Sequence, residues 1–199
     1  MIENQWGLKD PLSSEELLQR IEKMQNKIKD MFYQNHLSAK KKMDSYYLLR
    51  EQIEILDQMA WYLHKIDLNK KPQYTEFPLF RFGIYWAFLG QNIGSEMNKR
   101  RPVIVISAPP GSPMCTVISL TTKRKNDGRW YHVDLDDRNH TAICEQLKVI
   151  SRARLHVPYR NKASNGKKGH RIAEISENDR RKIASVLQRL YTIDSNGYD

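Results

Sequence analysis

The sequence predicts an α+β protein, with an N-terminal antiparallel helical hairpin, a small antiparallel β-barrel and a C-terminal helix. Three observations predict it. Apolar residues recur about every 3.5 positions up to Leu63, as in packed helix pairs. After Phe77 the apolar period changes to two, which is typical of strands. One amphipathic stretch then ends the chain. We therefore expect two domains, a helical extension over residues 1–75 and a barrel over residues 76–199.

Two heptad seams define the expected hairpin. The short stretch 36–42 between them is polar and basic and predicts the turn, and a short connection makes neighbouring helices antiparallel. Ser13 and Glu16 have the spacing of a capping box at the start of the first helix. The seam positions are Leu17, Ile21, Met24, Ile28 and Met31 in the first helix, and Tyr46, Leu49, Ile53, Leu56, Ala60 and Leu63 in the second.

Further large side chains lie beside these seams, namely Phe32, Tyr33, Trp61 and Tyr62. A two-helix hairpin cannot bury a second apolar face by itself. We expect this face to pack on the barrel, on a second subunit or on a partner protein. The stretch 68–78 contains two prolines and few apolar residues, so we interpret it as a linker.

Five short runs after Phe77 have the β-branched and aromatic composition of strands: 82–89, 102–107, 114–121, 130–135 and 141–150. Proline-rich and Asn-Asp-Gly turns separate them, at 109–113 and 126–128. Several short strands joined by turns predict a compact antiparallel barrel. A basic loop is expected over 158–171.

The last predicted element is a helix. Ser176 has the position of an N-cap, with Asp179 three residues further on. One face of the helix is apolar and comprises Ile183, Val186, Leu187, Leu190 and Ile193.

The positive charge is concentrated in the second part. The whole chain has a net charge of +10, from 33 Lys and Arg against 23 Asp and Glu. Residues 1–75 hold 12 basic and 11 acidic residues, which leaves 21 and 12 for residues 76–199. A basic domain is the expected footprint of a polyanionic partner, although an ordinary basic protein has the same composition.

Several classes of function are disfavoured. No apolar run is long enough to span a membrane and the first ten residues lack a signal-peptide core, so we expect a cytoplasmic protein. Cys115 and Cys144 lie in apolar runs and are expected to be buried free thiols. The histidines show no ligand spacing, so neither a metal nor another cofactor is expected. No nucleophile elbow and no phosphate-binding loop are present.

The segment GSEMNKRRPVIVIS, residues 94–107, is the most unusual part of the chain. Three consecutive cations lead directly into a buried strand. Pro102 restricts Arg101 to an extended conformation, whereas Lys99 and Arg100 are expected on a free loop. A guanidinium held in place is a good phosphate clamp, because its fork donates two parallel hydrogen bonds. Solvated surface charge is the alternative interpretation.

This segment resembles the opening of MazF/PemK toxins, in which a strand is followed by Gly-Ser-Glu, a short loop, Arg-Pro and an apolar strand. Gly94–Glu96, Arg101-Pro102 and Val103–Ile106 match this pattern in order. Residues 116–122 resemble the strand that ends in the family's threonine, and residues 145–155 a later Gln-containing stretch. The resemblance extends from Arg81 to Ile193. The family's glycines after Glu96 are absent, and the N-terminal helices are additional.

The resemblance implies a toxin of a type II toxin–antitoxin system. Such toxins are dimeric, ribosome-independent endoribonucleases that cut single-stranded RNA without a metal and are inhibited by a small antitoxin protein. Arg101 matches the family's catalytic arginine. Thr121 matches the catalytic threonine, with Thr122 as the alternative if the strand slips by one residue. The expected RNA groove comprises Ser95, Glu96, Lys99, Arg100, Thr122 and Gln146, and the aromatic residues Trp86, Trp130 and Tyr131 could stack bases.

Two other functions are compatible with the same barrel. One is a catalytically idle binding module that the helical extension tethers to its partner. The other is a gyrase poison of the CcdB type, which depends on C-terminal residues that include a terminal tryptophan. This chain ends Ser-Asn-Gly-Tyr-Asp, which disfavours the gyrase poison.

Overall fold

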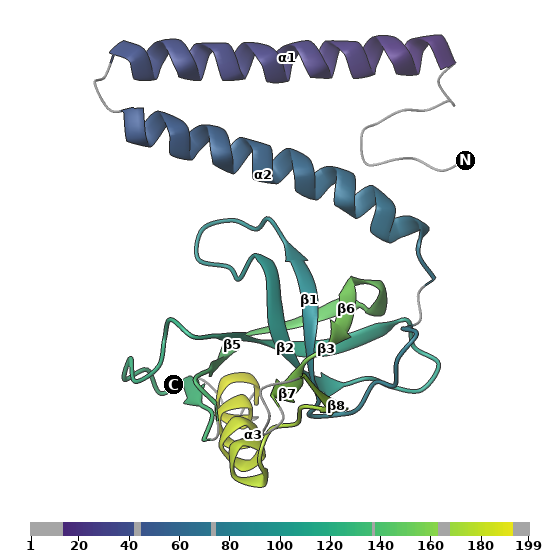
Figure 1. Ribbon diagram of the computed structural model, residues 1–199, viewed down its shortest axis with the longest axis vertical. Helices are drawn as coiled ribbons and strands as arrows, with labels where there is room; N and C mark the ends of the chain where they lie inside the picture. Colours follow the sequence, from purple (N-terminus) through teal and green to yellow (C-terminus); the bar gives the residue numbers. More distant parts are fainter. Residues whose placement is uncertain (1–13, 42–44, 73–74, 137, 163–167, 193–199) are drawn as a thin grey trace, which may run out of the picture. The chain divides into compact units, whose positions relative to one another are not determined.

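A computed structural model describes residues 14–41, 45–72, 75–136, 138–162 and 168–192 (Figure 1). The chain divides into two compact units that meet between Ala60 and Trp61. The first is helical and the second contains the sheet, so the predicted α+β class is confirmed. No helix in the described part of the chain combines the length and the apolar character that a bilayer crossing requires.

Both predicted N-terminal helices are present, as α1 (Ser14–Lys41) and α2 (Ser45–Lys70). Two boundaries differ from the prediction. Helix α1 runs through most of the expected turn, because residues 36–41 are polar but contain neither glycine nor proline. Helix α2 continues into the expected linker as far as Lys70. Ser13, the expected cap, and Ile193 of the last helix lie outside the described residues. The antiparallel packing of the two helices remains a prediction.

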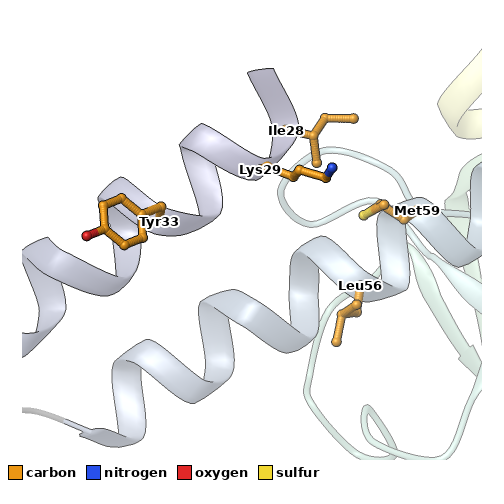
Figure 2. A pocket seen from close by; sticks show the side chains of 5 residues that line it. All are labelled: Ile28, Lys29, Tyr33, Leu56 and Met59. Atoms are coloured by element: carbon orange, nitrogen blue, oxygen red, sulfur yellow. The ribbon is translucent and has the colours of Figure 1, made fainter. Parts of the chain in front are cut away.

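Apolar side chains are exposed in the N-terminal unit. Ile28 and Tyr33 of α1 and Leu56 and Met59 of α2, together with Lys29, line an open hollow of about 470 Å³ (Figure 2). Tyr33 is 62% exposed and Leu56 is 57% exposed. The expectation that these helices offer apolar surface to a further partner is compatible with this exposure.

The second unit contains six antiparallel strands in the order β4-β5-β3-β2-β1-β6 (Figure 1). A separate two-stranded sheet, β7 with β8, contains residues 160–162 and 168–171 of the region that was predicted to be a basic loop. A short 3₁₀ helix, η1, joins β5 to β6. The bounds are β1 Ile84–Gly90, β2 Lys99–Ser107, β3 Met114–Thr121, β4 His132–Asp134, β5 Thr141–Ser151, η1 Arg152–Arg154, β6 Leu155–Pro158, β7 Arg160–Lys162, β8 Lys168–Ile172 and α3 Glu177–Tyr191.

The edge strands β4 and β6 are not paired with each other, so the described strands form an open sheet. The predicted barrel closure is therefore not confirmed. The edge strands have only 3 and 4 residues, which limits the ladder that either could form with a further strand.

The sheet is buried on both faces, because alternate residues of β2 point into two different apolar clusters. Ile104 belongs to the cluster that α3 covers with Ile183, and Val103 and Val105 belong to the other. The predicted cap of α3 is confirmed, since the Ser176 hydroxyl accepts a hydrogen bond of 3.0 Å from the Asp179 amide. These packed faces hold the three central strands rigidly in place.

Cys115 and Cys144 are buried free cysteines, as predicted. Burial raises the pKa of Cys115 to about 11 and that of Cys144 to about 12. Both side chains therefore stay protonated at neutral pH and behave as small apolar groups.

The last turns of α2 belong to the second unit and pack against the end of β1. Leu68 is buried, and the Trp61 ring lies directly beside Gly90. Gly90 has a φ of +102°, and a Cβ added there would lie 2.8 Å from the Trp61 ring. Glycine is thus required at this position both by backbone conformation and by space.

We predict that Gly90→Ala lowers the free energy of unfolding by about 2–4 kcal/mol, through backbone strain and overpacking together. Gly111→Ala is the matched control, because its φ is +75° but nothing lies within 4 Å of the added Cβ. The control should lose only about 1 kcal/mol. Denaturant unfolding of both variants measures the difference, and equal losses would show that Trp61 does not occupy this position in solution.

Candidate active site at one end of the sheet

Arg101 lies inside the central strand β2, not at its entrance as predicted. Strand β2 begins at Lys99, and Lys99, Arg100 and Arg101 pair with Gly90, Phe88 and Ala87 of β1. The prediction that Lys99 and Arg100 occupy a free loop is therefore wrong. Pairing with β1 supplies backbone hydrogen bonds that extend the strand by three residues beyond the apolar run.

The Arg101 guanidinium is half-buried and held at one nitrogen. Its Nε donates a hydrogen bond of 2.9 Å to the Asn98 carbonyl. No described residue accepts a hydrogen bond from its two Nη atoms. The terminal nitrogens are thus oriented but available, which suits two parallel hydrogen bonds to a phosphate.

Thr121 is the last residue of β3. The ladder between β2 and β3 ends at the pair Val103 and Ser119, and its register, continued by two residues beyond the ladder, would place Arg101 opposite Thr121. Directly opposed residues of an antiparallel pair lie on one face of the sheet, with Cβ atoms about 5 Å apart.

The Thr121 side chain is 4% exposed, and its Oγ1 accepts a hydrogen bond of 3.2 Å from the Lys123 amide. This contact leaves the hydroxyl proton available as a donor. Thr122 is exposed and lies beyond the end of the strand. The register therefore favours Thr121 over Thr122 as the threonine that faces Arg101.

The loop between β1 and β2 is attached to β5 by Gln146. Its Oε1 accepts a hydrogen bond of 2.6 Å from the Met97 amide, and its Nε2 donates one of 3.1 Å to the Ser95 carbonyl. Lys148, two residues further along β5, forms an ion pair of 2.9 Å with Glu96. Ser95, Glu96 and Gln146, which the sequence placed in one groove, are brought together.

The sequence did not predict Lys148 or Asn92 as residues of the groove. The Asn92 Nδ2 donates a hydrogen bond of 2.7 Å to the Met97 carbonyl and so closes the loop on itself. The alternation of Gln146 and Lys148 along a predicted strand was a usable signal, because residues two apart share a face. No local pattern marked Asn92.

Arg100 does not join Arg101. Its guanidinium carbon lies 4.8 Å from the centroid of the Trp86 ring. Successive residues of a strand point to opposite faces, so adjacent arginines serve two different surfaces. Trp130 is also engaged by a cation, since the Arg189 guanidinium lies 4.1 Å from its ring centroid.

Positive charge accumulates at this end of the sheet. Strand β3 runs antiparallel to β2, so the residues after its end lie near the start of β2. Lys123, Arg124 and Lys125 follow Thr121 there and are exposed, near the cations 99–101. With Arg101 itself, these residues make six cations in the segments 99–101 and 123–125, and such a cluster creates a field that attracts a phosphate backbone.

In the described part of the chain, no group of three or more His, Cys, Asp or Glu side chains is arranged to hold a metal ion. Arg101 contacts the loop through the Asn98 carbonyl, and Thr121 lies at the end of the neighbouring strand β3. This set can bind and stabilise an anion.

Comparison with protein families agrees with this geometry. Residues 80–191 match the model of the PemK-like, MazF-like toxins of type II toxin–antitoxin systems. The chain belongs to this family. The matched segment includes β1 to β6 and all of α3 but neither N-terminal helix. No curated protein matches the chain.

Solved structures give weaker likenesses. MazF from Deinococcus radiodurans is 16% identical, with a TM-score of 0.44, over 58% of this chain and 97% of that one. An endoribonuclease in complex with its cognate antitoxin, from a Mycobacterial species, is 16% identical, with a TM-score of 0.41, over 57% and 94%. Mycobacterium tuberculosis toxin MazF-mt6 is 17% identical, with a TM-score of 0.38, over 56% and 98%.

We predict that Gln146→Ala loosens the loop between β1 and β2 in this toxin. The substitution removes the side-chain acceptor of the Met97 amide, so hydrogen exchange at Met97 should accelerate by at least tenfold, as about 1.4 kcal/mol of lost protection implies. Lys148→Gln, which removes only a partly exposed ion pair, is the control and should change exchange less than about fivefold. Unchanged exchange at Met97 in Gln146→Ala would contradict the proposed attachment.

Proposed function

We propose that this toxin is a metal-independent endoribonuclease that cleaves single-stranded RNA through the 2′-hydroxyl of its substrate. The proposal is supported by the register of β2 with β3, whose continuation beyond Val103 and Ser119 places Arg101 opposite Thr121. Neither residue is a metal ligand or an activated nucleophile. A substrate that brings its own nucleophile suits such a site, and RNA does so.

In the proposed reaction, the 2′-oxygen attacks the adjacent phosphorus and the bond from phosphorus to the 5′-oxygen breaks. The attacking hydroxyl loses its proton and the leaving oxygen gains one, so the products are a 2′,3′-cyclic phosphate and a 5′-hydroxyl. Arg101 stabilises the charge that develops on the phosphorane, and Thr121 donates a hydrogen bond to a non-bridging oxygen. Holding the reacting atoms in line supplies the rest of the acceleration.

Ser95, Glu96 and Gln146 would form one wall of the RNA groove, and Lys99 would contribute backbone attraction. Arg100 faces away from Arg101, and Thr122 lies beyond the end of β3. Both would act on the flanking nucleotides. The cognate partner would be an antitoxin protein, as in other type II systems, and the active form a homodimer. The exposed apolar residues of α1 and α2 support a role in assembly or partner choice for the helical extension predicted over residues 1–75.

We predict that the purified protein cleaves single-stranded RNA in the presence of EDTA and leaves the corresponding DNA intact. The reason is the need for a 2′-hydroxyl in a site whose chemistry uses only Arg101 and Thr121. Gel analysis of a long RNA, with end-group mapping of the fragments, tests both statements. Cleavage that occurs only with added divalent metal would overturn the mechanism.

We predict that Arg101→Ala slows cleavage by about 100–1,000-fold, as loss of one preorganised charge stabiliser typically does. Arg100→Ala is the matched control. It removes the same charge from the neighbouring residue but from the face that carries Trp86. The control should slow cleavage less than about tenfold. Single-turnover rates measure the chemical step, and similar losses in both variants would exclude a catalytic role for Arg101.

A further inference from the structure

A small cavity lies between the last turns of α2 and the segment that follows β5. Its volume is about 100 Å³. All of its lining residues belong to the second unit. They are Trp61, Lys65, Leu68, Asn69, Lys71, Ser151, Ala153 and Arg154.

Three cations line this cavity, namely Lys65, Lys71 and Arg154. No described carboxylate forms an ion pair with any of them. Burial is the largest cause that lowers the pKa of nearby His156, and the charges of Arg100 and Lys71 lower it further. Because of these two charges, the surroundings of the cavity are positive as well. Clustered cations without an acidic partner repel one another unless an anion joins them.

Arg154 is fixed in the wall of the cavity. Its Nη1 donates hydrogen bonds of 3.2 Å and 3.0 Å to the carbonyls of Phe88 and Leu89 in β1. The Trp61 ring lies beneath its guanidinium, 5.3 Å from ring centroid to guanidinium carbon. Nε and Nη2 have no acceptor among the described residues. Two oriented donors thus remain for a ligand.

The cavity is close to the candidate active site along β1. Phe88 and Leu89, which hold Arg154, directly follow Ala87, the strand partner of Arg101. Phe88 pairs with Arg100, and the charges of Arg100 and of Lys71, which lines the cavity, both act on His156. The cavity therefore neighbours the face of the sheet that carries Arg100. An RNA strand that is held at Arg101 and extends past Arg100 reaches the cavity with a neighbouring part of its backbone.

We propose that this cavity binds one phosphate group of the RNA substrate outside the cleaved bond, an inference that rests on RNA being the substrate. The cavity has room for a single phosphate and not for a peptide segment. Its donors, two ammonium groups, a guanidinium, the Asn69 amide and the Ser151 hydroxyl, suit phosphate oxygens. The site depends on α2, so the additional helix extends the RNA-binding surface of the toxin.

The test compares Lys65→Gln/Lys71→Gln in the full-length chain with the matched control Lys70→Gln. Lys70 is the last residue of α2, directly precedes Lys71 and is exposed, but it does not line the cavity. The probe is a 2′-O-methyl RNA oligonucleotide, which binds but cannot be cut through its 2′-oxygens. Its Kd is measured as a function of salt concentration, and melting temperatures confirm that the variants are folded.

We expect the double variant to weaken binding of this probe by about tenfold, and to reduce the slope of log K against log salt by about 0.7, the value for one phosphate contact on a single strand. For cleavable RNA, KM should rise and kcat stay the same. The control Lys70→Gln should change neither the Kd of the probe nor the KM of cleavable RNA by more than about twofold.

Equal RNA binding by the double variant and the control would overturn the inference. So would normal RNA binding with weakened binding of an acidic antitoxin peptide, because the cavity would then receive a protein carboxylate. If the wild-type chain binds the probe with this dependence on Lys65 and Lys71 but cuts no RNA, the phosphate site stands and the proposed catalytic function fails.

Discussion

The pairing of β2 with strands on both sides is the constraint on which the candidate site depends. Strand β1 fixes Arg101 beside Ala87, and the register of β2 with β3, continued beyond Val103 and Ser119, leads to Thr121. A slip of one residue would turn either side chain to the other face of the sheet. Such a slip is strongly opposed, because both faces of these strands are buried and every apolar side chain would leave its cluster. The same packing that stabilises the fold therefore sets the geometry of the site.

The candidate site also depends on a loop that is anchored without being buried. The loop between β1 and β2 has Gln146 on one side and the Asn98 carbonyl, which holds Arg101, on the other. The Gln146 hydrogen bonds are neutral, so they persist when salt screens the surrounding charges, whereas the ion pair of Glu96 with Lys148 is weakened. Residues 93–96 of the loop remain exposed between these attachments.

The additional helix α2 does not end where the toxin fold begins. Its last turns pack on β1 through Trp61 and Leu68 and form a wall of a cationic cavity with Arg154. Earlier along α2, apolar side chains such as Leu56 are exposed. One helix therefore carries two surfaces of different chemistry. The first extends a basic, polar site, and the second offers apolar area to a protein.

Local patterns in the sequence determined the α+β class, the position of each central strand, the capped helix at Ser176 and the identity of Arg101 as the unusual cation, because periodicity and turn residues act over a few neighbours. Tertiary structure alone decided the rest. Pairing and packing between distant segments set the start of β2 at Lys99, the opposite faces of Arg100 and Arg101, and the cavity that Lys65 and Arg154 both line. Such contacts leave no mark in the local sequence, because their energy comes from packing and from hydrogen bonds across strands.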